Sequence, residues 1–134
     1  MDSAVTSRFN IRLFVLWALA AAVINSILFQ IYKSGDSALV VNLGGTKMTV
    51  GAPAVLVVSF FALTIAYLVI SKIGASGSKL ISNISWIGLV FAILTALAPL
   101  IGGKTLLTSL GLSSLHLVAG IFWFLGVRRT IHLS

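Results

Sequence analysis

The sequence predicts an all-α membrane protein in which four transmembrane helices form an antiparallel bundle, with a short extracytoplasmic β-hairpin loop between the first two helices. The chain is 59% hydrophobic and 8% charged, whereas soluble domains average about 25% charged residues. It contains four apolar runs of about 20 residues without internal charge, the length that a helix needs to cross a hydrocarbon core of about 30 Å. We therefore expect a single transmembrane domain covering residues 1–134.

The boundaries of the helices follow from the apolar runs and from the residues that interrupt them. The first run is longer than the apolar region of a signal peptide, which spans about 7–15 residues, so we expect it to remain as a helix. Pro53 opens the second run, and proline is favoured in the first turn of a helix, where its missing N–H costs nothing. Gly102-Gly103-Lys104 separates the third run from the fourth. The expected helices cover residues 11–32, 53–73, 80–101 and 106–127.

The loop between the first two helices carries a hairpin signal. Two runs that favour strands, residues 38–43 and 46–50, flank Gly44-Gly45. Glycine supplies the positive φ angles that a type I′ turn needs, so this pair predicts a two-residue hairpin connection. An isolated hairpin is marginally stable in water, and we therefore expect it to pack on the outer ends of the helices. Its role is to cap the bundle or to form a lid over a binding site.

The basic residues near the helix ends predict the orientation in the membrane. Lysine and arginine are enriched in cytoplasmic loops. One side of the predicted bundle carries both termini and the second loop, and the other side carries the first and third loops. This distribution places both termini in the cytoplasm of a multi-pass inner-membrane protein. The first side holds Arg8, Arg12, Lys72, Lys79, Arg128 and Arg129, and the second holds Lys33, Lys47 and Lys104.

The composition excludes several functional classes. The net charge is +7, but the basic residues are scattered between apolar runs, so we expect no nucleic-acid partner. The chain has no cysteine and only two acidic residues, Asp2 and Asp36, both outside the apolar runs. A serine–histidine hydrolase lacks its orienting acid here. One chain cannot supply both histidines of a haem site, because His132 follows Arg128 and Arg129, so only a homodimer could pair two copies of His116. We therefore predict no enzyme, no catalytic residue, no metal site and no cofactor.

Small residues on each predicted helix indicate the faces that meet in the bundle. Membrane helices associate through close packing at small residues and through interhelical hydrogen bonds. At 100° per residue, each set below falls within an arc of about 100°. The sets are Ala18, Ala21, Ala22 and Asn25; Ser59, Ala62 and Ala66; Ser85, Gly88, Ala92, Thr95, Ala96 and Pro99; and Ser109, Ser113, His116 and Gly120. The tryptophans, in contrast, lie toward the cytoplasmic side, and most of them are typical of interface anchors: Trp17, Trp86 and Trp123.

Five polar residues on these faces are the candidate ligand-binding residues: Asn25, Ser59, Thr95, Ser113 and His116. The helical rise places the first four about 5–7 Å to the outer side of the helix midpoints. We expect them to form a polar layer with His116 immediately below it. An ionisable residue inside a membrane is a candidate functional residue by default. The alternative is structural, since a neutral His116 bonded to Asn25 or a serine would stabilise the bundle, and serine and threonine can bond to a carbonyl of their own helix.

Several of these residues also stand in a familiar order. Asn25-Ser26-Ile27-Leu28-Phe29, the loop ending in Pro53, Thr95 with Ala98-Pro99, and residues 115–120 (Leu-His-Leu-Val-Ala-Gly) follow one another across the four segments. In this order the chain resembles a family of small bacterial four-helix membrane proteins of unknown function. The resemblance implies the four-helix architecture and implies no activity.

Two functional classes stay open. The first is a non-catalytic small integral membrane protein, an oligomer or an accessory subunit of a larger membrane assembly, with the lipid bilayer and other membrane subunits or copies of itself as partners. The short loops and the lack of reactive groups favour it. The second is a small-molecule or ion binding or transport protein with a polar intramembrane site around His116. A cavity that reaches His116 from the outer surface beneath the hairpin would favour the second class.

Overall fold

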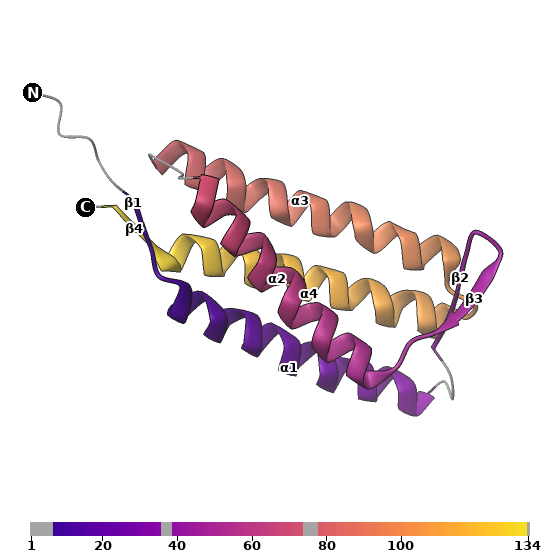
Figure 1. The fold of residues 1–134 in the computed structure, drawn as a ribbon. Coiled ribbons are helices and arrows are strands. Elements are labelled where there is room, and N and C mark those ends of the chain that lie inside the picture. The colour runs from indigo at the N-terminus through magenta and orange to yellow at the C-terminus, as the bar shows by residue number, and fades with distance from the viewer. Residues whose placement is uncertain (1–6, 36–38, 74–77, 134) are drawn as a thin grey trace, which may run out of the picture.

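The computed structural model describes residues 7–35, 39–73 and 78–133, and four helices make up most of them (Figure 1). They are α1 (Ile11–Gly35), α2 (Ala52–Ile73), α3 (Ser78–Gly102) and α4 (Leu106–Thr130). Each is long and apolar enough to cross a membrane, which confirms the predicted all-α class and its four membrane helices. Each predicted range lies within the observed helix. The helices extend up to three residues further because backbone hydrogen bonding continues past the point where the apolar run ends, as at Arg128 and Arg129 in α4.

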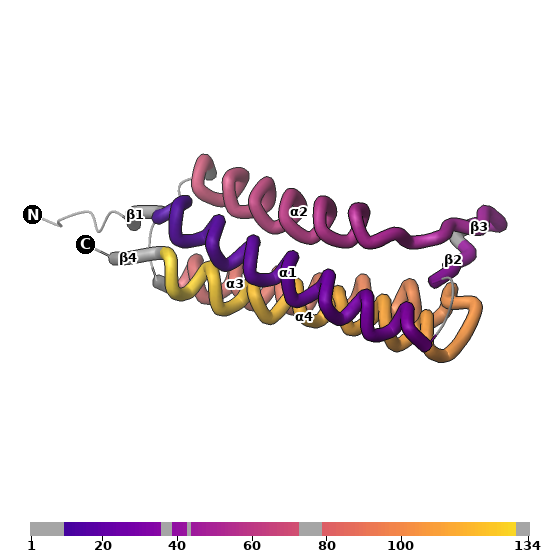
Figure 2. Tube along the Cα trace, turned by 90° about the horizontal axis from the view of Figure 1, so that it is seen from below, coloured from indigo at the N-terminus to yellow at the C-terminus, as the bar shows by residue number. Residues whose placement is uncertain are grey.

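α4 is the central helix of the fold. It packs against both α3 and α1, whereas α2 packs on α1 and only sparsely on α4. Of the apolar stretch of α4, 44% is buried within the chain, against 11% for α2. Successive helices run in opposite directions, so both ends of the chain lie at one end of the molecule (Figure 1). Figure 2 shows α1 between α2 and the α3–α4 pair, which leaves α2 on the outside.

An aromatic cluster holds the core near the chain termini. The ring of Phe14 on α1 stacks on the ring of Tyr67 on α2, with 3.9 Å between centroids and 8° between planes. Trp123 of α4 meets Phe14 edge-on at 5.7 Å, and its indole Nε1 donates to the carbonyl of Ile84 on α3 at 3.3 Å. Trp123 is buried in the bundle, so it is not one of the interface anchors. An indole whose N–H has a partner inside the bundle does not need the membrane interface.

The predicted small-residue faces are confirmed for α1 and α3 but not for α2. Ala62 and Ala66 are exposed, and the buried side of α2 carries Val55, Leu63 and Tyr67 instead. The reason lies in the partner helix: large side chains of α2 pack against the alanines of α1, so a second row of small residues has nothing to accommodate. On α1 and α3 the small face is buried at Ala18, Ala21, Ala22, Ala92, Ala96 and Pro99.

The predicted hairpin is confirmed between α1 and α2. Strands β2 (Val40–Leu43) and β3 (Thr46–Thr49) pair in antiparallel register around Gly44 and Gly45. Both glycines have positive φ angles, 57° and 86°, as a type I′ turn requires. The hairpin packs on the turn between α3 and α4, where the amide of Lys104 donates to the carbonyl of Val40 at 3.1 Å. Ala38, the expected first residue of the hairpin, lies outside the described residues.

A second short ribbon joins the two ends of the chain. β1 (Ser7–Phe9) pairs with β4 (Ile131–Leu133) in antiparallel register, next to the start of α1 and the end of α4. The amide of Asn10 continues the pairing by donating to the carbonyl of Thr130 at 3.1 Å. Sequence reasoning missed these strands because three residues are too few to show an alternating pattern.

Candidate functional site

Asn25 is the centre of the polar contacts between helices. Its side chain is 1% exposed, and its Nδ2 donates to Ser59 Oγ at 2.9 Å and to the carbonyl of Leu115 at 3.2 Å. One amide group therefore connects α1 with both α2 and α4. Within the described residues, its Oδ1 is buried and accepts no hydrogen bond. A buried carbonyl oxygen without a partner is unusual, and it leaves one acceptor free for a donor group.

Ser113 and Thr95 do not join the Asn25 contacts. Ser113 Oγ donates to the carbonyl of Ala96 at 2.8 Å and so connects α4 with α3. Thr95 Oγ1 donates to the carbonyl of Ala92, one turn back in its own helix, at 3.1 Å. The expected polar layer is thus divided into two interhelical contacts, one on each side of α4, and a threonine that is satisfied locally.

His116 lies on the face of α4 where it was expected but is not enclosed. Its neighbours one turn away, Leu112 and Gly120, are buried, whereas His116 itself is exposed. It makes no hydrogen bond to the described residues, including Asn25 and Ser113. The expectation that the bundle encloses this side chain is therefore wrong, because α2 leans on α1 and leaves this part of α4 uncovered. Its role in binding stays a prediction.

The chemistry available at this site is neutral hydrogen bonding. Asn25 and Ser59 offer amide and hydroxyl groups, and His116 adds an imidazole that donates through one nitrogen and accepts through the other. The described residues contain no cluster of three histidine, cysteine, aspartate or glutamate side chains. The arrangement therefore suits contact with a polar group of another helix or of a small molecule.

Sequence reasoning did not find a second polar contact at the end of the molecule that holds the termini. The guanidinium of Arg128 donates from Nε to Ser85 Oγ at 3.1 Å and from a terminal nitrogen to Ser82 Oγ at 3.3 Å. The same group lies over the ring of Phe124, 4.2 Å from its centroid. The available signal was the pair of serines three residues apart in the first turns of α3, facing an arginine in the last turn of α4.

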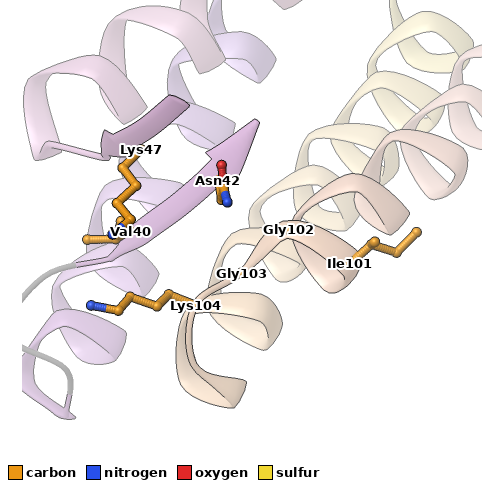
Figure 3. A pocket seen from close by; sticks show the side chains of 7 residues that line it. All are labelled: Val40, Asn42, Lys47, Ile101, Gly102, Gly103 and Lys104. Carbon is orange, nitrogen blue, oxygen red and sulfur yellow. The ribbon is translucent and has the colours of Figure 1, made fainter. Parts of the chain in front are cut away.

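A pocket at the opposite end was also missed. It has a volume of about 380 Å³ and lies in the seam between the hairpin and the α3–α4 turn (Figure 3). Neither His116 nor Asn25 lines it, so it is not the outer entrance that the ligand-binding hypothesis requires. Its lining consists of Val40, Asn42, Lys47, Ile101, Gly102, Gly103 and Lys104.

Four apolar helices around a small polar centre define the chain as a small multi-pass membrane protein. Comparison with protein-family models matches residues 5–132 to the "Family of unknown function (DUF6069)". The match spans nearly the whole chain, so the protein belongs to this family, and the resemblance drawn from the sequence is confirmed. Searches of curated proteins and of solved structures found no match.

Proposed function

We propose that this protein is a non-catalytic membrane subunit that associates with another transmembrane helix through the face of α4 that carries His116. The observation that supports the proposal is the exposure of His116 near the middle of a membrane helix. Polar and ionisable side chains inside a membrane almost always face the interior of a bundle. An imidazole that this chain leaves uncovered is therefore explained by a partner that covers it.

The partner is a second copy of the chain or another membrane subunit. The residues one turn away from His116 on α4, Leu112 and Gly120, are apolar. A partner helix would meet one polar group within an apolar surface, which is the usual composition of contacts between membrane helices. The imidazole would contribute an interhelical hydrogen bond, and such bonds average about 0.6 kcal/mol in a membrane.

We further propose the orientation of this subunit in the inner membrane. Both termini lie in the cytoplasm and the β2–β3 hairpin lies outside it. The support is the distribution of basic residues, six on the side of the termini and three on the side of the hairpin, in line with the enrichment of lysine and arginine in cytoplasmic loops.

The test is the variant His116→Ala in the full chain, purified in a mild detergent. We expect the wild type to run as an oligomer or to co-purify with a second membrane protein, and the variant to lose that association. The matched control is Leu117→Ala, which shortens an exposed side chain about 100° around α4 from His116 and keeps the imidazole. Multi-angle light scattering gives the mass of each complex. An unchanged mass and an unchanged set of co-purifying proteins in His116→Ala would refute the proposal.

The alternative, a small-molecule or ion binding protein, is favoured by one observation, the buried Asn25 Oδ1 without a partner. A bound molecule with a donor group would satisfy this oxygen. The same experiment separates the two functions, since a binding protein would keep its assembly and its stability in His116→Ala. Mass spectrometry of the small molecules that co-purify would then show the loss of one species.

A further inference from the structure

We propose that the pocket between the hairpin and the α3–α4 turn binds the phosphate group of an anionic lipid. Lys47 and Asn42 come from facing positions of the hairpin strands, and Lys104 comes from the turn. Figure 3 shows the side chains of Lys47 and Lys104 extending toward the same end of the pocket, near Val40. Two ammonium groups and an amide thus line one pocket.

The charges around the pocket favour an anion. Two lysine side chains in the lining give the pocket a positive charge, which attracts an anion. The described residues contain no aspartate or glutamate at all, since the chain has only Asp2 and Asp36 and both lie outside the described residues. A phosphate group matches the two lysines because lysine binds phosphate as a point charge.

The position of the pocket is set by glycines in the turn. A Cβ on Gly102 would come within 3.0 Å of the carbonyl oxygen of Asn42. A Cβ on Gly103 would meet Pro99 O at 2.8 Å and would overlap the side chain of Ser109. A side chain at position 102 would crowd β2 at Asn42, and one at position 103 would collide with the turn itself, beside the bridge between Val41 and Gly103. Backbone contacts between β2 and the α3–α4 turn thus place Lys104 and Lys47 in the lining of one pocket.

A lipid fits this place better than a free anion because apolar surface adjoins the charges. Ile101 lines the pocket and is 86% exposed, and Leu106, at the start of α4, is 75% exposed. These are the two most exposed large apolar side chains of the described chain. In a membrane, a headgroup in the pocket would place its acyl chains beside them. Basic side chains near a membrane surface each contribute about 1 kcal/mol to binding of anionic lipid, or about fivefold in affinity.

The experiment uses the full chain in mild detergent and measures lipid binding by native mass spectrometry. The probes are palmitoyl-oleoyl phosphatidylglycerol, which is anionic, and the matching phosphatidylcholine, which is zwitterionic. We expect the wild type to prefer phosphatidylglycerol, and Lys47→Ala/Lys104→Ala to bind it about 25-fold more weakly. The matched control is Lys72→Ala/Lys79→Ala, which removes two exposed lysines at the other end and should keep the preference. Circular dichroism checks the helix content of every variant.

Two further measurements complete the test. Lys47→Ala alone changes an exposed strand of the hairpin and should weaken binding about fivefold even where the double variant fails to fold. Inorganic phosphate at 10 mM distinguishes the sources: displacement of the lipid shows that the pocket accepts free phosphate, and retention shows that the acyl chains are needed. An equal affinity of the wild type for both lipids, or an equal loss in the control pair, would overturn the proposal.

Discussion

The hydrogen bond of 2.9 Å from Asn25 Nδ2 to Ser59 Oγ connects α2, the least buried helix, to α1. The same nitrogen donates to the carbonyl of Leu115, so the amide of Asn25 also fixes α1 against α4. This one side chain therefore connects three of the four helices at the point where they meet. In lipid, apolar surface alone gives helices little reason to associate, and interhelical hydrogen bonds contribute about 0.6 kcal/mol each on average.

The Asn25–Ser59 contact predicts energetic coupling between the two residues. Asn25→Ala should lower the free energy of unfolding by about 1–2 kcal/mol, because two interhelical hydrogen bonds are lost. Ser59→Ala should cost about 0.6 kcal/mol. In the double variant the two losses should fall short of additivity by about 0.6 kcal/mol. Unfolding in mixed detergent micelles, followed by tryptophan fluorescence, measures all three variants.

Ser26→Ala is the control for this cycle. Ser26 Oγ bonds to the carbonyl of Ala22 in its own helix, at 2.8 Å. Its removal should change stability little and should add to Asn25→Ala without coupling. Strict additivity of Asn25→Ala and Ser59→Ala would show that the bond does not form in the membrane protein.

The burial of two of the candidate residues was predictable, but the contacts that they make were not. The helical repeat placed Asn25 and Ser113 on faces that are indeed buried. The helical repeat does not show how a helix packs against its neighbours. Here α2 packs on α1, which brings Ser59 to Asn25 and leaves His116 exposed. This packing depends on large side chains of α2, such as Tyr67, fitting against alanines of α1. A single sequence does not reveal such a fit.

The Arg128 contacts predict that the two arginines at the end of α4 differ in their effect on stability. Arg128→Ala should lower the free energy of unfolding by about 1 kcal/mol, because the guanidinium stacks on Phe124 and bonds to Ser82 and Ser85. Arg128→Lys should recover only part of this loss, since an ammonium lacks the planar fork that reaches two hydroxyls. Arg129→Ala, which removes the same charge one residue later, should be nearly neutral. Equal losses at the two positions would contradict this assignment.

The fold itself was predictable because its signals are long and redundant. A run of about 20 apolar residues admits few structures other than a membrane helix, and Gly44-Gly45 is a strong local turn signal. What sequence reasoning missed, the β1–β4 ribbon, depends on the two chain ends meeting through the packing of α1 on α4. No local pattern encodes that meeting.

The proposed orientation predicts which residues a reagent reaches from outside the cell. The chain has no cysteine, so a single introduced cysteine reports one position. Thr46→Cys, on the hairpin, should react with a membrane-impermeant maleimide in intact cells. Ser134→Cys should react only after the membrane is opened. The opposite pattern would show that the hairpin faces the cytoplasm and would reverse the proposed topology.

The close approach of α3 and α4 predicts a rescue between Gly120 and Ala92. A Cβ on Gly120 would come within 2.5 Å of the Cβ of Ala92, so Gly120→Ala should push the helices apart and cost about 1–3 kcal/mol. Ala92→Gly should cost about 1 kcal/mol through helix propensity. The exchange Ala92→Gly/Gly120→Ala restores one methyl group at the contact and should be more stable than Gly120→Ala alone. Thermal unfolding in detergent measures the three variants, and a double variant less stable than either single one would show that the helices do not meet at this point.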